Sequence, residues 1–367
     1  MPCETLFRNK RILVTGACGT VGAELVRQLL TDPAYGPAEV IGIDNNESQL
    51  FFLDQKWLDD PKARFFVTDV RDADELTRRM YGIDIVFHTA ALKHVILSER
   101  SPEQAVMTNI HGVQNVASAA IRTQVEKVVF TSSDKAVNPT SVMGTSKLMG
   151  ERLMTAANSN KRGDGPVFAS TRFGNVLGSS GSVIPIFHNQ IAQGGPVTLT
   201  HPEMTRFVMS ISQAVRLVID SASLARGGEV FITKMPVIRI IDLARVMIDE
   251  LAPRYGFDPK DIKINQIGTK PGEKLYEELM SDEETRRSVE LPEYFAVLPA
   301  FRGIYHDIDY RYENLMSTTV DNPYNSSNEP PLEPEALRAF LLEHGLLGEP
   351  AESMAQRYWP GDKEEKK

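Results

Sequence analysis

The sequence predicts an α/β protein built on a doubly wound parallel sheet, with a smaller C-terminal lobe. Through the first 135 residues, apolar runs alternate with helical patterns at a regular interval. The runs are continuously apolar, as expected for parallel strands that helices cover on both faces. The third observation is size: 367 residues, 42% of them hydrophobic, suffice for a large core and suggest two domains or one unit with an appended lobe.

The sequence patterns predict the following helices and strands. Helical patterns cover 20–31 and 72–80, near 212–225, 241–252, 272–280 and 334–347. Strands are expected at 11–16, 40–44, 64–69, 83–88, 127–131 and 229–233. The segment 321–334 is rich in Asn, Pro and Ser and predicts an extended arm, and 348–367 predicts a flexible tail.

Charge and cysteine content exclude several functions. The net charge is −9 and there is no concentrated basic face, so nucleic acid is not an expected partner. With only Cys3 and Cys18, neither a disulfide framework nor a zinc quartet is expected, and we predict no metal site. The sequence has no apolar stretch of 18 residues and no signal-peptide pattern, so we expect a cytoplasmic protein without a membrane partner.

A glycine motif follows the first predicted strand and opens the first helix. Its spacing is G-x-x-G-x-x-G, with Thr20 and Val21 in the last interval, and it comprises Gly16, Gly19 and Gly22. A tight turn in any α/β protein would explain glycines alone. However, Asp44 ends the second strand 22 residues past Gly22, where an acid accepts hydrogen bonds from ribose hydroxyls and repels a 2′-phosphate. The combination predicts a dinucleotide site that prefers NAD to NADP.

Two further residues end the third strand. Asp69 and Val70 are placed to meet the adenine of a dinucleotide. Asp69 has an equally good alternative as the N-cap of the helix over 72–80.

The fifth strand ends in Ser133, Asp134 and Lys135, and Met143 and Lys147 follow at a spacing that places them one turn apart on a helix. The layout resembles the extended short-chain dehydrogenase/reductase family, whose pattern is Ser…Tyr-x-x-x-Lys, with Met143 at the tyrosine position. The resemblance implies a Rossmann-like fold and a Lys147 that holds the nicotinamide ribose. A thioether has no proton to exchange, so Met143 is not expected to be a base.

The resemblance becomes more specific in longer segments. They look like those of nucleotide-sugar 4,6-dehydratases that act on UDP-N-acetylglucosamine in polysaccharide biosynthesis, and the likeness spans about residues 8–330. The matching segments are 90–95, 108–109, 133–147, 172–185, 204–207 and 272–277.

The resemblance also implies further binding residues. For the cofactor these are Ala90, Ala91, Lys93 and Asn109, together with Lys147. For the nucleotide sugar they are Lys93, Arg172, Asn175, Ser182, Val183, Thr205, Arg206 and Glu273. Arg172 and Arg206 could instead form structural ion pairs, and Glu273 matches by pattern only.

The implied organisation is an NAD-binding domain over 1–176 with about 205–235, and a nucleotide-sugar-binding lobe over 177–204 and 236–320. The arm and helix over 321–347 follow. We also expect a homo-oligomer, a dimer or a hexamer.

The expected reaction is redox-neutral. The 4-hydroxyl of the sugar is oxidised, water is eliminated across carbons 5 and 6, and the hydride returns to carbon 6 from a tightly bound NAD. We expect Asp134 to be the acid, Lys135 the base at carbon 5, and inversion at carbon 5. Alternatives are a nucleotide-sugar 4-epimerase, which needs tyrosine at position 143, and a non-catalytic NAD-binding regulator.

Overall fold

A computed structural model describes residues 6–178, 182–268, 273–301 and 307–348. The predicted tail beyond Gly348 lies outside these ranges, as do Cys3 and part of two motif segments, 179–181 and 272. The largest element is a nine-stranded sheet with the order β13-β14-β10-β6-β5-β4-β1-β2-β3. Its strands are β1 Arg11–Thr15, β2 Glu39–Asp44, β3 Ala63–Val67, β4 Ile85–His88, β5 Lys127–Thr131, β6 Val167–Arg172, β10 Val230–Thr233, β13 Ser288–Glu290 and β14 Tyr294–Val297.

The run from β3 to β10 is parallel, and β14 and β13 add antiparallel strands at one edge. The order changes direction between β1 and β4, which creates the crevice where doubly wound sheets bind ligands. The predicted Rossmann-like fold is therefore confirmed.

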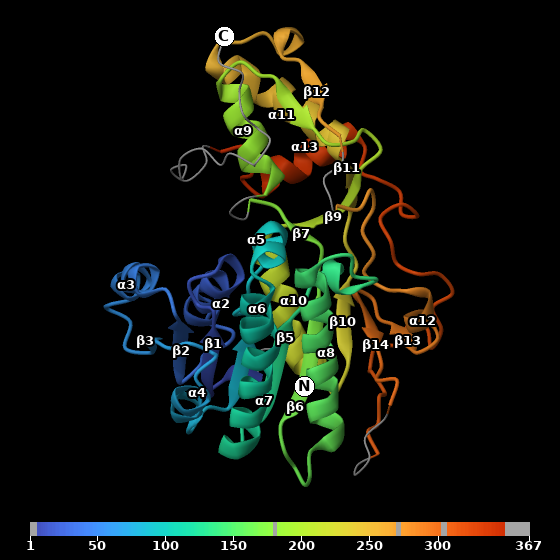
Figure 1. Ribbon diagram of the computed structural model, residues 1–367. Helices are drawn as coiled ribbons and strands as arrows, with labels where there is room; N and C mark the ends of the chain where they lie inside the picture. Colours follow the sequence, from blue (N-terminus) through green and yellow to red (C-terminus); the bar gives the residue numbers. More distant parts are fainter. Residues whose placement is uncertain (1–5, 179–181, 269–272, 302–306, 349–367) are drawn as a thin grey trace.

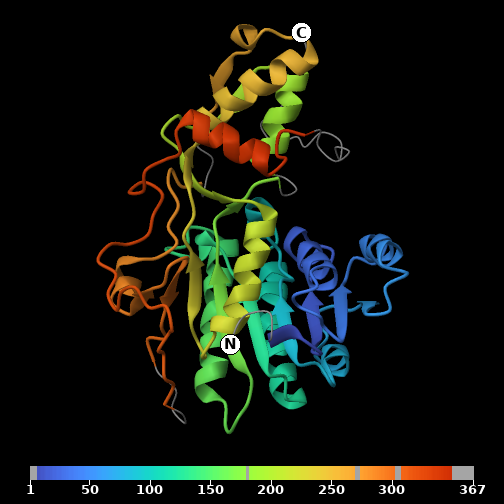
Figure 2. The same ribbon diagram turned by 180° about the vertical axis from the view of Figure 1, so that it is seen from behind.

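Helices cover both faces of this sheet (Figures 1 and 2). One apolar cluster joins the sheet to α2 and α10, and a second joins it to α4, α7 and α8. The helices of this part are α2 Thr20–Thr31, α3 Glu47–Lys56, α4 Ala73–Met80, α5 Val95–Arg100, α6 Pro102–Val106, the π-helix η1 Met107–His111, α7 Gly112–Thr123, α8 Val142–Asn160 and α10 Ile211–Leu224.

A smaller lobe stands beyond the carboxyl ends of the parallel strands, at the top of Figure 1. It has its own apolar core, to which α9, α11 and α13 contribute. Its elements are β7 Asn175–Val176, α9 Val183–Ala192, β8 Val197–Leu199, β9 Thr205–Met209, β11 Val237–Arg239, α11 Ile240–Leu251, η3 Ala252–Tyr255, η4 Pro259–Asp261, β12 Ile264–Gln266 and α13 Pro334–Glu343. The short α12, Asp282–Thr285, lies beside β13.

The structure differs from the expectations in two places near the C-terminus. The strands β13 and β14 belong to the large sheet, although 236–320 was expected to form the lobe. Residues 273–280 form no helix, because their backbone pairs with other segments: Leu275 accepts a hydrogen bond from Thr205, and Leu279 donates one to Tyr324. Residues 321–334, expected to be an extended arm, form an irregular segment that lies against residues 277–280.

Across the described ranges, none of the helices has the length and apolar character needed to span a membrane.

Candidate active site

The glycine motif forms the turn between β1 and α2. A Cβ on Gly22 would stand 2.1 Å from the carbonyl oxygen of Gly16, so only glycine lets the first turn of α2 pack onto the loop. The helix begins at Thr20 and Val21, and its N-cap Gly19 offers no side-chain cap. An uncapped N-terminus at the carboxyl edge of a parallel sheet is a ready site for a phosphate group.

Two predicted acids lie at the ends of the neighbouring strands. Asp44 ends β2, and its carboxylate accepts hydrogen bonds from the backbone amides of Cys18 and Asn46, each at 3.0 Å. It therefore reaches the glycine loop, as the prediction for a ribose-binding acid requires. Asp69 instead pairs with Arg71, whose hydrogen bonds hold the pKa of Asp69 below its usual value. The N-cap of α4 is Asp72, so the capping alternative for Asp69 is wrong.

The remaining predicted cofactor residues lie after β3, on the loop after β4, and in η1. Val70 is buried under Gly112, and the loop after β4 carries Ala90, Ala91 and the exposed Lys93. Asn109 is buried, and its side chain bonds both backbone groups of Leu92 and the hydroxyl of Ser146. Asn109 therefore ties the loop after β4 to α8, which positions that loop.

Directly after β5, the short 3₁₀-helix η2 (Asp134–Ala136) packs against the start of α8. Gly144 makes this possible, since a Cβ there would stand 2.3 Å from the carbonyl oxygen of Lys135. Ser141 caps α8 by accepting a hydrogen bond from the amide of Gly144. The helix thereby fixes the backbone that carries Asp134 and Lys135.

The predicted acid and base form a close pair. The Lys135 ammonium lies 3.0 Å from Oδ2 of Asp134, and the Ser133 hydroxyl donates to Oδ1 of Asp134 at 2.6 Å. Asp134 is buried, which opposes ionisation, but the charge of Lys135 and the hydrogen bonds from Ser133 and Lys135 together lower the pKa of Asp134. Burial opposes the charge of Lys135, but the carboxylates of Asp134 and Glu277 raise the pKa of Lys135. Asp134 is thus held as a carboxylate and Lys135 as an ammonium.

The helix α8 carries Met143 and Lys147, and both side chains are buried. The Lys147 ammonium donates to the carbonyl of Thr131 at 2.9 Å and lies 4.9 Å from the ring centre of Phe130. Burial lowers the pKa of Lys147 to about 8. The nearby imidazole of His88 is also buried, which lowers its pKa to about 3 and keeps it neutral.

The prediction that Arg172 binds substrate is corrected by the structure. Arg172 is 1% exposed, and its guanidinium bonds the carboxylates of Glu151 and Glu284 and the carbonyl of Leu279. These contacts occupy its five N–H donors, so no donor is left for a ligand. The alternative of a structural ion pair is correct.

Two more predicted substrate residues are engaged within the protein. The Arg206 guanidinium bonds the backbone of residues 205, 274 and 275 and lies 3.3 Å from a carboxylate oxygen of Glu277. The amide nitrogen of Asn175 donates to the other oxygen of Glu277 at 2.7 Å and more weakly to the carbonyl of Phe207. Both residues contact the carboxylate of Glu277.

The other predicted substrate residues lie at the starts of α9 and β9 and next to Arg206. Ser182 and Val183 begin α9, and the Ser182 hydroxyl is buried without a hydrogen-bond partner among the described residues. Thr205 begins β9 and exchanges a hydrogen bond with the Ser326 hydroxyl at 2.9 Å. Glu273 lies 3.7 Å from the Arg206 guanidinium.

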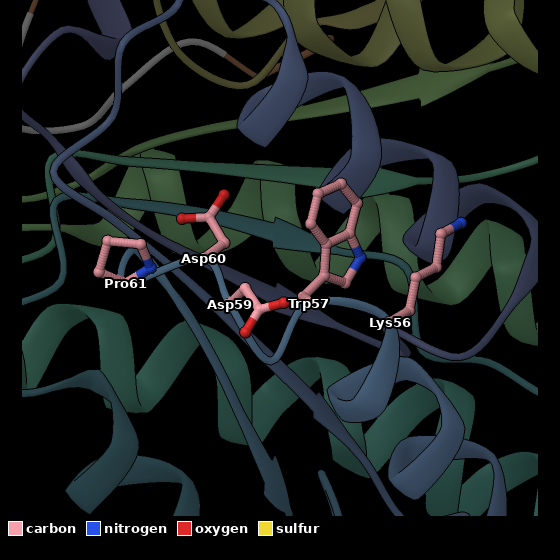
Figure 3. A pocket seen from close by; sticks show the side chains of 5 residues that line it. All are labelled: Lys56, Trp57, Asp59, Asp60 and Pro61. Atoms are coloured by element: carbon pink, nitrogen blue, oxygen red, sulfur yellow. The ribbon is translucent and has the colours of Figure 1, made fainter.

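Sequence reasoning assigned no role to Glu277, Glu151 and Ser326, which the structure places in these networks. Glu277 was visible as the last residue of a matching segment, but nothing in the sequence indicates that it reaches η2. A surface hollow of about 460 Å³, lined by Lys56, Trp57, Asp59, Asp60 and Pro61, lies between α3 and β3 and holds none of the predicted site residues (Figure 3).

Three features define an enzyme of the extended short-chain dehydrogenase/reductase class. They are the doubly wound sheet, the glycine loop with an acid at the end of β2, and the buried lysine on α8. A family model described as "Polysaccharide biosynthesis protein" matches residues 12–299. The chain belongs to this family.

Relatives with several names cover nearly the whole chain. A Methanocaldococcus jannaschii protein named an uncharacterized membrane protein is 47% identical over 94% of this chain and 98% of its own length. A Rickettsia canadensis UDP-glucose 4-epimerase is 37% identical, over 92% of this chain and 96% of its own. An inverting UDP-N-acetylglucosamine 4,6-dehydratase of Campylobacter jejuni is 34% identical, over 89% and 95%.

Two solved structures extend the comparison. Pen from Bacillus thuringiensis has a TM-score of 0.84 and 40% identity, with 93% of this chain and 99% of that chain covered. The dTDP-glucose 4,6-dehydratase DesIV from Streptomyces venezuelae, solved with NAD bound, has a TM-score of 0.63 and 26% identity, with 72% and 86% covered. The chain is therefore an enzyme of the nucleotide-sugar dehydratase and epimerase class.

Proposed function

We propose that this enzyme is a UDP-N-acetylglucosamine 4,6-dehydratase that forms a UDP-4-keto-6-deoxy sugar, with inversion at carbon 5. The observation that carries the proposal is the Asp134–Lys135 pair, held 3.0 Å apart at the end of β5 beside the buried Lys147. Elimination of water from carbons 5 and 6 needs an acid and a base at adjacent carbons, which is what this pair offers. The Campylobacter jejuni relative supports the substrate.

The residues present fit NAD. The uncapped N-terminus of α2 suits a pyrophosphate, and Asp44 suits the hydroxyls of a ribose and opposes a 2′-phosphate. Lys147, whose ammonium donates to the carbonyl of Thr131 at the end of β5, would hold the nicotinamide ribose. When bound there, NAD would accept the hydrogen of carbon 4 and return it at carbon 6, so that the reaction has no net oxidation.

The protein residues move the protons. In this proposal Asp134, as a carboxylate, takes the proton of the 4-hydroxyl while carbon 4 is oxidised. The resulting ketone acidifies carbon 5, whose proton passes to the neutral amine of Lys135, the ammonium having first given its proton to solvent. Asp134 then delivers its proton to the departing 6-hydroxyl, which leaves as water. After the elimination, solvent returns a proton to the opposite face of carbon 5. The proton that Asp134 collects in the first step is the one that it uses in the second.

Because Met143 cannot act as a base, the proton of the 4-hydroxyl is assigned to Asp134. A thioether cannot take a hydroxyl proton, and Met143 is buried at the start of α8. Lys147 acts by holding the ribose and by its positive charge. At the other end of the substrate, the uncapped start of α9 at Ser182 and Val183 and the exposed Lys93 would receive the diphosphate.

A 4-epimerase is the second candidate, and the Rickettsia canadensis relative supports it. An epimerase returns the hydride to carbon 4 and has no use for an acid at carbon 6. The Asp134–Lys135 pair and the methionine at position 143 therefore favour the dehydratase.

Proton NMR of the product formed from UDP-N-acetylglucosamine in heavy water tests the proposal. We expect a methyl group at carbon 6, deuterium at carbon 5 and no accumulation of NADH absorbance. UDP-N-acetylgalactosamine as the product would show an epimerase, and steady NADH formation would show a simple dehydrogenase. As a control on the cofactor, mass spectrometry of the denatured protein is expected to find NAD, whereas NADP would contradict the role of Asp44.

A further inference from the structure

The segment 273–278 contacts the turn that follows η2. The Lys274 ammonium donates a hydrogen bond to the carbonyl of Val137 at 3.0 Å and another to Oε2 of Glu278 at 2.9 Å. The other oxygen of Glu278, Oε1, accepts a hydrogen bond from the side-chain amide of Asn138 at 3.0 Å. Lys274 and Glu278 thus bind each other and two consecutive residues of the turn.

The backbone of this segment is held by contacts of its own. The carbonyl of Leu275 accepts a hydrogen bond from the amide of Thr205 at the start of β9, at 3.0 Å. Glu278 pairs with Asn325 of the C-terminal arm in an antiparallel bridge. Because these contacts are made by the backbone, a change in the side chain of Lys274 or Glu278 is expected to leave the segment in place.

The turn has a conformation that needs support. Asn138 has a φ of 43°, in the left-handed region that residues other than glycine rarely adopt. Pro139 follows it, and a residue before proline is normally extended. Strained residues of this kind persist only where their surroundings hold them, and they gather at functional sites. The hydrogen bonds from Lys274 and to Glu278 act at this strained position.

The turn is directly connected to the acid and base of the proposed reaction. The amide of Val137 donates to the carbonyl of Asp134 at 3.1 Å and closes η2, and the amide of Lys135 donates to the Ser133 hydroxyl at 3.2 Å. Since η2 has only three residues, a displacement of Val137 moves the backbone of Asp134 and Lys135 with it.

We propose that Lys274 and Glu278 are positioning residues, which hold the turn at Val137 and Asn138 and thereby fix the place of the Asp134–Lys135 pair. What the pair does in the reaction rests on the dehydratase function proposed above. The support of the turn does not depend on that function.

The support is expected to act on kcat. An acid and a base must lie within hydrogen-bond reach of the protons that they move, and a displacement of about 1 Å can cost about 100-fold in rate. The glycine loop and the start of α9, where the cofactor and the diphosphate are proposed to bind, are other parts of the chain. Loss of the support should therefore lower kcat and change KM little.

The first test reverses one hydrogen bond. Asn138→Asp removes the donor and places a carboxylate against that of Glu278, so kcat for UDP-N-acetylglucosamine is expected to fall about tenfold. Adding Glu278→Gln supplies a donor from the other side at the net charge of the wild type. The amide oxygen of the glutamine can still accept from Lys274, so the double variant should regain most of the lost kcat.

The thermal midpoint and KM of both variants should stay near those of the wild type. An unchanged kcat in Asn138→Asp, or a double variant as slow as Asn138→Asp alone, would overturn the proposal.

A second variant keeps the test valid if Asn138→Asp does not fold. Lys274→Met removes both hydrogen bonds of the ammonium, and kcat is expected to fall about tenfold or more. Lys234→Met is the matched control, because Lys234 pairs with Glu290 of β13 at 2.7 Å and has a similar side-chain exposure, 28% against 26% for Lys274. Lys234→Met should keep kcat, and an equal kcat in the two variants would contradict the proposal.

Hydrogen exchange of the protein without substrate separates the two proposals. Peptides that cover residues 133–141 should exchange faster in Asn138→Asp and Lys274→Met than in the wild type, and at the wild-type rate in the double variant. If these differences are found and the wild type does not convert UDP-N-acetylglucosamine, the support stands and the dehydratase function fails. If the sugar is converted and the variants match the wild type in both exchange and kcat, the support fails alone.

Discussion

Two clusters of acids and bases join the sheet to C-terminal segments, and they differ in how fully their hydrogen bonds are used. In one, Arg172 at the end of β6 is enclosed by Glu151 of α8 and Glu284 of α12, and its five donors are occupied. In the other, ion pairs connect Asp134, Lys135, Glu277 and Arg206, and the Lys135 side chain is 38% exposed.

Their protonation differs in the same way. Although burial opposes ionisation of Glu284, Arg172 lowers its pKa to about 2, so this carboxylate stays charged at any physiological pH. In the second cluster the pKa of Glu277 is raised to about 7. The first cluster, with all donors of Arg172 bonded and its charges fixed, supports the fold. The second, partly exposed and with a carboxyl whose pKa lies near neutral pH, is suited to acid–base chemistry.

The largest expected effect is on stability, when the cluster of Arg172, Glu151 and Glu284 is broken. Arg172→Met leaves two buried carboxylates without their cation, which is expected to lower the free energy of unfolding by about 3–5 kcal/mol. Urea denaturation of the wild type and the variant measures it. A loss below about 1 kcal/mol would show that the cluster is not structural.

The acid dependence of unfolding sharpens this test. Because the pKa of Glu284 is lowered from 4.5 to about 2 in the folded protein, its contribution is present above pH 4.5 and is lost as the pH falls toward 2. Arg172→Met should show less of this loss.

The second effect is on catalysis and concerns the cluster that contains Asp134 and Lys135. Asp134→Asn and Lys135→Ala are each expected to lower turnover of UDP-N-acetylglucosamine by about 100-fold or more, as for acid–base groups. Ser133→Ala should cost less, since a water can replace its hydroxyl. All three should retain bound NAD, as mass spectrometry can check. Near-full activity in Asp134→Asn or Lys135→Ala would make this cluster structural as well.

The smallest effect is expected at Met143, which belongs to neither cluster. Met143→Leu nearly conserves volume and should cost less than about 1.5 kcal/mol of stability. Most of the turnover should be kept. A variant as inactive as Asp134→Asn would give the thioether a role in the reaction that packing does not explain.

The large features were predictable from the sequence because they depend on local patterns. The continuous apolar runs indicated the parallel strands, and the glycine spacing with Asp44 indicated the loop between β1 and α2. Ser133, Asp134 and Lys135 follow β5 directly, so their place at the edge of the sheet came with the strand.

Contacts between distant segments could not be predicted in this way. Arg172 sits in a segment that resembles a substrate-binding motif, and only the positions of Glu151 and Glu284, 21 and 112 residues away, reveal that it is buried and paired. Glu277 shows the opposite case. The sequence predicted a helix over its segment, 272–280, which the structure lacks, and its contacts are with Asn175, Arg206 and the arm.

The contact of Ser326 with Glu277 has a consequence for recombination between family members. The arm and the segment 273–278 touch through backbone groups and one hydroxyl, and Ser326 also bonds Thr205. A chimera that takes its arm from one parent and the segment 273–278 from another would combine two segments whose contacts did not evolve together. Crossover points placed before residue 273 should therefore yield active hybrids more often than points placed between 280 and 320.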